Sequence, residues 1–170
     1  QYIAFKGRPA RTEEINYWIN NQGISSSLEL AREISKEGSY ANEPIADQVN
    51  SLFVNLFGHN ADAGGLIYWT KNIEQGVLTL GDLSHDLIYA AENPVAGIDG
   101  QAALDILALQ KRTAAAELFT ANVEVGGFIL DYDNEAAFEV ARSFISTIKA
   151  DSEFTAEQLI TFTQQQVIKM

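Results

Sequence analysis

An internal repeat constrains the fold of this 170-residue chain more than any other feature of its sequence. Tyr2–Gly7 aligns with Phe53–Gly58 at an offset of 51 residues. After a two-residue insertion the offset becomes 53, which aligns Leu30–Ile34 with Leu83–Leu87. The two Trp of the chain occupy equivalent positions, and each directly follows a Tyr. Such self-similarity indicates a duplicated supersecondary unit.

Each copy predicts helices separated by turns that contain Gly. In the segment 43–57 apolar residues recur at the i, i+4, i+7 and i+8 positions that form one buried helix face. Gly58 is expected to end this helix in the left-handed conformation. The candidate N-caps, whose side-chain oxygens can accept from free amides of a first helical turn, are Thr12, Ser27, Asp62 and Thr79.

The remainder of the chain is also helical but does not form a third copy. We expect helices over 94–122 and 134–150 and from Thr155 onward, with a break at Gly126 and Gly127. Helix should therefore make up roughly two-thirds of the residues, well above the usual third.

The sequence thus predicts an all-α, compact multi-helix domain of about seven to nine helices with an internal duplication. We expect a single domain over 1–170, built from repeat one (1–41), repeat two (42–93) and C-terminal helices (94–170). Because the chain opens inside a repeat, we also expect it to be part of a longer protein. The Tyr–Trp pairs should face the core, so that Trp69→Ala would cost on the order of 3–5 kcal/mol.

Composition excludes several function classes. Asp and Glu outnumber Lys and Arg by 23 to 11, which gives a net charge of −12 and argues against nucleic acid as a partner. The apolar stretches are too short for a membrane span, and the absence of Cys removes disulfides and thiolate chemistry. The sequence has no Gly-x-Ser-x-Gly, P-loop or Gly-x-Gly-x-x-Gly motif, so we expect no enzyme activity.

The loop before each Tyr–Trp pair resembles a bacterial domain of unknown function found in secreted repeats-in-toxin proteins and surface-layer proteins. That family is distantly similar to phycobilisome linker domains, and its signature is Gly-Arg-x-Pro-Asp-x-x-Gly-x-x-Tyr-Trp. The segment Gly58–Trp69 matches its Gly, Asp and Tyr–Trp positions but has His59 in place of Arg and Ala61 in place of Pro. The earlier copy has Arg8 but lacks the Asp and the second Gly.

The resemblance implies an extracellular, cell-surface protein exported by type I secretion. We expect a surface-anchoring domain that binds lipopolysaccharide or another surface glycan, either directly or with calcium assisting the binding. The domain can also contact other copies of the same protein. The alternative is a non-catalytic helical scaffold or linker module that binds other proteins.

The sequence offers two sets of candidate site residues, and it leaves two interpretations of the Tyr–Trp pairs open. The candidate ligand-binding residues, which lie near equivalent turns of the copies, are Arg8, Asn20, Asn21, His59, Asn60 and Lys71. The candidate calcium ligands are Asp131, Asp133 and Glu135. An EF-hand is not expected, because its sixth and twelfth positions here are Ala136 and Arg142, and Asp133 or Asn134 can instead cap the next helix. The Tyr–Trp pairs could stack on sugar rings, although core packing is favoured.

Overall fold

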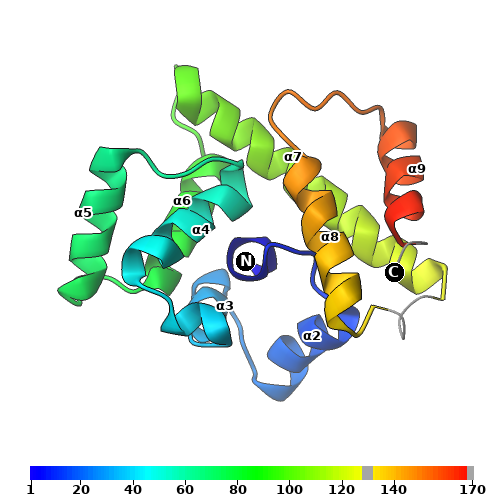
Figure 1. The fold of residues 1–170 in the computed structure, drawn as a ribbon, viewed down its shortest axis with the longest axis horizontal. Helices are drawn as coiled ribbons and strands as arrows, with labels where there is room; N and C mark the ends of the chain where they lie inside the picture. The colour runs from blue at the N-terminus through cyan, green and yellow to red at the C-terminus, as the bar shows by residue number, and fades with distance from the viewer. Residues whose placement is uncertain (128–131, 168–170) are drawn as a thin grey trace.

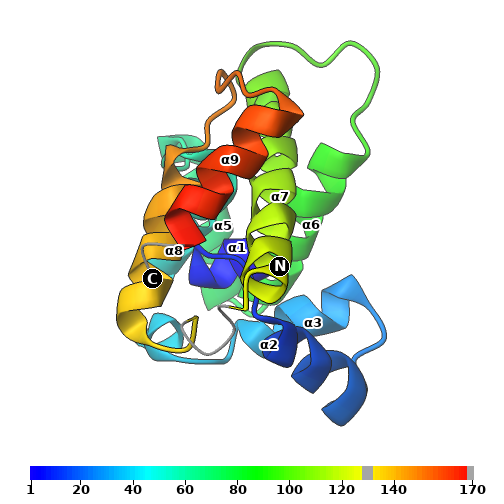
Figure 2. The same ribbon diagram turned by 90° about the vertical axis from the view of Figure 1, so that its right-hand side faces the viewer.

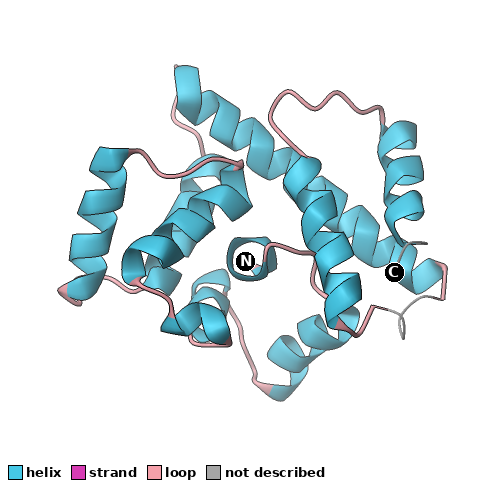
Figure 3. Ribbon diagram, in the orientation of Figure 1, coloured by secondary structure: helices cyan, strands magenta, loops and turns pink. Residues whose placement is uncertain are grey.

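The computed structural model describes residues 1–127 and 132–167. Helix accounts for 70% of the structure, and no strand occurs in the described residues (Figure 3). The prediction of an all-α compact domain with seven to nine helices is confirmed, since nine α-helices occur within these ranges. None of the helices described is both long enough and apolar enough to cross a membrane.

Figure 1 shows the order of the elements along the chain. In chain order they are α1 (Tyr2–Lys6), α2 (Thr12–Asn16), a π-helical turn η1 (Tyr17–Asn21), α3 (Ser27–Ile34), a 3-10 turn η2 (Ser39–Asn42), α4 (Ile45–Phe57), α5 (Ala63–Glu74), α6 (Leu80–Glu92), α7 (Gly100–Val125), α8 (Glu135–Thr147) and α9 (Ala156–Val167).

Helix boundaries follow the offsets of the sequence repeat. α4 ends 51 residues after α1, α5 begins 51 residues after α2, and α6 begins 53 residues after α3. Elements that the offsets align also pack together, α1 against α4 and α3 against α6. At the second contact a Cβ on Gly81 would lie 2.6 Å from the Cα of Arg32, so the two helices approach backbone to backbone. The duplication itself stays a prediction from the sequence.

Most of the predicted turns and caps are confirmed. Gly58 ends α4 in the left-handed region with φ 89°. Asp62 caps α5 by accepting from the backbone N–H of Gly65 at 2.9 Å. Thr79 caps α6, and Asn134 caps α8.

The two caps predicted for the first copy were wrong by one residue. Ser26, not Ser27, accepts the first-turn N–H of α3. Thr12 is the first residue of α2, which follows Arg11. There the carboxylate of Glu14 accepts from the backbone N–H of Arg11 at 2.9 Å, so a side chain in the first turn satisfies the helix end without a hydroxyl cap.

The start of α7 also differs from the prediction. We expected helix from Pro94, but α7 begins at Gly100. Gly97 and Gly100 both have positive φ values, 82° and 59°, so the backbone leaves the helical region before α7.

Two clusters of buried apolar side chains form the core. The first gathers side chains from α1, η1, α3, α4, α6 and the early part of α7, and the second gathers those of the later part of α7 and of α8. α7 runs through both clusters, and Figure 2 shows α9 lying alongside it, in agreement with their contacts.

The prediction that both Tyr–Trp pairs face the core was only partly correct. Trp18 is buried, with 6% of its surface exposed, and Trp69 is half-buried. Tyr17 and Tyr68 are 43% and 57% exposed. Successive helical residues point about 100° apart, so one ring of each pair turns outward when the other turns inward.

Candidate functional site

The six predicted ligand-binding residues do not form one site. Arg8 is buried in the loop after α1. Asn20 and Asn21 lie exposed in η1, and Lys71 lies exposed on α5. His59 and Asn60 lie in the loop between α4 and α5.

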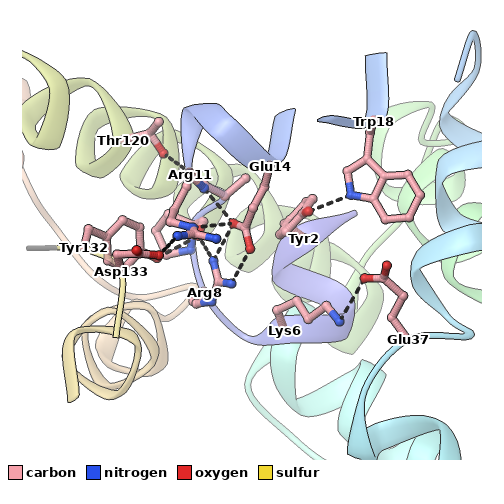
Figure 4. A network of polar contacts seen from close by, with 12 residues as sticks. Tyr2, Lys6, Arg8, Arg11, Glu14, Trp18, Glu37, Thr120, Tyr132 and Asp133 are labelled. Carbon is pink, nitrogen blue, oxygen red and sulfur yellow. Dashed lines mark hydrogen bonds and ion pairs between the residues drawn. The ribbon is translucent and has the colours of Figure 1, made fainter. Parts of the chain in front are cut away.

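Arg8 uses its donors inside the protein (Figure 4). Its Nη1 and Nη2 donate to the two carboxylate oxygens of Glu14 at 2.8 and 2.6 Å, and Nη1 also donates to the carbonyl oxygen of Pro9. Its guanidinium carbon lies 4.1 Å from the ring centre of Phe138. Burial raises the pKa of Glu14, but the hydrogen bonds from Arg8 and from the Arg11 backbone outweigh burial and lower it. Arg8 thus holds its own loop through both Nη groups.

The surrounding contacts tie the loop 7–11 to the C-terminal helices (Figure 4). Tyr132 donates from Oη to the carbonyl oxygen of Pro9 at 2.7 Å, and Thr120 on α7 donates from Oγ1 to that of Ala10 at 2.8 Å. Burial raises the pKa of Tyr132 to about 12, so its hydroxyl stays protonated and able to donate.

Two of the three predicted calcium ligands form ion pairs with arginines. Asp131 lies outside the described residues. Asp133 forms an ion pair with Arg11, and Glu135 forms one with Arg142. Within 1–127 and 132–167 no group of three or more His, Asp or Glu side chains is placed to hold a metal ion. Arginines therefore already neutralise two of the three predicted carboxylates.

His59 links the α4–α5 loop to α7. Its Nε2 lies 2.8 Å from Oδ1 of Asp105, its Nδ1 lies 2.7 Å from the carbonyl oxygen of Asn60, and its ring stacks on Phe57. Burial lowers the pKa of His59, but the hydrogen bonds to Asn60 and Asp105 outweigh burial, and the pKa rises above its ordinary 6.5.

This contact predicts a pH-dependent contribution to stability. Because the folded state binds the His59 proton more tightly than the unfolded state, the contribution is fully present below pH 6.5 and is lost as the pH rises through the folded-state pKa. We expect His59→Gln to flatten the decline of the urea midpoint between about pH 6 and pH 8. His85→Gln, which leaves the Asp105 contact in place, is the matched control. An unchanged pH profile in His59→Gln would contradict the prediction.

An exposed Tyr with polar neighbours recurs in both copies. In η1, Tyr17 is followed by the exposed Asn20 and Asn21, three and four residues on. On α5, Tyr68 is followed at the same spacing by Lys71 and Asn72. Residues three and four apart on an α-helix share a face. In the wider π-helical turn η1 the residue four apart, Asn21, shares the face of Tyr17, and Asn20 lies beside it. We call these two sets the tyrosine faces: Tyr17, Asn20 and Asn21 in the first copy, and Tyr68, Lys71 and Asn72 in the second.

Three of the four polar members of the tyrosine faces were among the predicted site residues. Asn72 was missed, although the 51-residue offset that aligns Tyr17 with Tyr68 also aligns Asn21 with Asn72. The tyrosines were assigned to the core because both residues of a Tyr–Trp pair were treated as inward-facing.

Comparison of the chain with protein-family models, curated proteins and solved structures finds no match. The resemblance to the secreted bacterial domain therefore rests on the sequence motif alone.

Proposed function

We propose that this chain is a non-catalytic binding domain of a cell-surface or secreted protein, and that it anchors the protein by binding lipopolysaccharide or another surface glycan. The observation that carries this proposal is the pair of tyrosine faces. In each of them an exposed aromatic ring lies beside side chains that donate hydrogen bonds. The extracellular location is proposed from the motif Gly58–Trp69.

The chemistry of the tyrosine faces suits a sugar. An exposed ring offers an apolar surface and a hydroxyl at its edge, a combination that favours ligands with both C–H faces and hydroxyl groups. The Asn21 amide and the Lys71 ammonium supply further donors. The amides of Asn20 and Asn72 each already donate one hydrogen bond within the protein, to Asn16 at 3.3 Å and to the carbonyl oxygen of Tyr68 at 2.7 Å. Next to the first face, Gln22 donates from its amide to the Oη of Tyr17 at 3.0 Å.

Charge favours neutral sugar hydroxyls over phosphates as the contacted groups. At a net charge of −12 the domain repels phosphate-bearing lipids. Calcium could bridge surface carboxylates to such phosphates, since it prefers oxygen ligands. The arginine partners of Asp133 and Glu135 reduce the carboxylates free for that role, so we place direct sugar contact first.

The test is binding of the folded domain to immobilised lipopolysaccharide and to an array of surface glycans, with and without a chelator. We expect Tyr17→Ala and Tyr68→Ala each to weaken binding roughly two- to tenfold, and the double variant to weaken it more. Tyr89→Ala is the matched control, because Tyr89 is similarly exposed, at 59%, but lies on α6 outside the tyrosine faces.

Each outcome decides between specific alternatives. Binding that survives the chelator supports direct contact, and binding lost with the chelator supports the calcium bridge. Equal effects of all three Tyr variants would contradict the assignment of the tyrosine faces.

A second candidate function, a protein-binding scaffold, is favoured by the apolar residues exposed on the same elements. Ile19 and Ile67 are 57% and 69% exposed and lie in η1 and α5. Exposed apolar groups of this kind also suit a protein partner. A folded domain that binds no surface glycan would favour this second function.

A further inference from the structure

The side chain of Arg112, in the middle of α7, is buried without an acidic partner. Only 2% of its surface is exposed. Its Nε donates to the carbonyl oxygen of Ile148 at 2.8 Å, and its Nη1 donates to those of Val54 and Asn55, both at 2.6 Å. No carboxylate of the described residues forms an ion pair with it, whereas buried charges in proteins are normally paired.

One donor group of Arg112 is left over. Nη2 makes no hydrogen bond to any described residue, while Nε and Nη1 are both occupied. Gly58 provides the space beside it, since a Cβ at this position would lie 2.9 Å from Nη2. The carbonyl groups at the end of α4 offset part of the positive charge of the buried guanidinium.

A pocket of about 370 Å³ opens at this point between α4, α7 and α8. Its lining includes Arg112, Arg142, Gly7, Gly58, Asn55 and Ser143. The volume falls within the range of pockets that hold small molecules. Glu139 also lines the pocket, and its carboxylate lies 2.7 Å from Nη2 of Arg142.

We infer that this pocket binds a small anionic ligand, through a carboxylate or phosphate group that accepts from Nη2 of Arg112. A guanidinium edge is the protein group best suited to such oxygens. Ser143 on the wall can donate from its hydroxyl, and Arg142 adds a second positive charge at the cost of its contacts with Glu139 and Glu135. The pocket contains no residue of the tyrosine faces, so this inference is independent of the proposed glycan binding.

The direct test is calorimetric titration of the folded chain with inorganic phosphate and with glucuronate, each against chloride at matched ionic strength. Glucose, which has the sugar ring but no charge, is the negative control. We expect saturable binding of at least one of the two anions and none of glucose. Preference for phosphate or for glucuronate identifies which oxyanion the site takes. Absence of saturable binding of both anions would overturn the inference.

Two variants and their controls locate the anion. Gly58→Ala places a methyl group against Nη2, so we expect binding to weaken roughly tenfold or more. Gly76→Ala also places a Cβ on a residue with positive φ, +68° compared with +89° at Gly58, so it introduces a similar backbone strain. No atom lies within 4 Å of the new Cβ, so this control variant should bind the anion normally.

Glu139→Gln keeps the inference testable even if Gly58→Ala does not fold. Glu139 is exposed and competes for Arg142, so its neutralisation should tighten anion binding about two- to fivefold. Glu33→Gln, which neutralises an exposed carboxylate paired with Lys36 on α3, is the control and should leave affinity unchanged. Equal tightening in both variants would show a general effect of net charge and overturn the site.

Discussion

Trp18→Ala is expected to lower the free energy of unfolding by about 3–5 kcal/mol, the range for truncating a large buried aromatic. The ring of Trp18 belongs to the first core cluster, and its Nε1 donates to Oη of Tyr2 at 2.6 Å. The substitution therefore opens a cavity and also removes the hydrogen-bond donor to a hydroxyl whose pKa burial raises to about 12. Urea denaturation monitored by circular dichroism measures the loss.

Trp69→Ala is the matched control, since it removes the same side chain from the equivalent position of the second copy. Trp69 is only half-buried, so we now expect a loss of about 1–3 kcal/mol instead of the full cost predicted from the sequence. Equal losses at the two positions would contradict the different burial of the two rings.

Arg112→Leu is expected to destabilise the protein by about 3–5 kcal/mol. Leu roughly fills the apolar part of the site but donates no hydrogen bond, and the carbonyl groups of Val54, Asn55 and Ile148 lose a charged donor. The carbonyl oxygen of Val54 keeps the backbone N–H of Gly58 as a donor at 3.0 Å. A buried group that is left without a partner costs about 1–3 kcal/mol, and such costs are not additive. Thermal and urea unfolding measure the change.

The control for this prediction is Arg32→Leu. Arg32 is an exposed arginine, paired with Asp82 across α3 and α6 at 2.6 Å, and exposed pairs contribute about 0–1 kcal/mol. A mild effect of Arg112→Leu, similar to that of Arg32→Leu, would show that water replaces the lost donor.

The fold was predictable where the signal is local. Gly58, Asp62 and Thr79 end or begin helices because of their own backbone and side-chain chemistry, and the structure has them in these roles. The helix α4 was predictable from the spacing of its apolar residues, within two residues at its start.

The candidate sites were predictable only in part, because they depend on partners far away in the chain. Nothing near Arg8 in sequence indicates that Phe138 lies under its guanidinium. The acceptors of Arg112 come from two segments, 57 or 58 and 36 residues away, so no local pattern marks it as buried. By contrast, Asn72 could have been found by extending the repeat alignment four residues beyond Tyr68.

The unequal lengths of the aligned helices fix the order in which the chain can assemble. α1 has five residues and α4 has 13, and helices shorter than about 12 residues are marginal in water unless another element supports them. The support for α1 is its packing against α4. During synthesis α1 leaves the ribosome before α4, so this packing contact cannot form until residue 57 has also emerged. The contact that stabilises α1 therefore forms only after a helix later in the chain has been made.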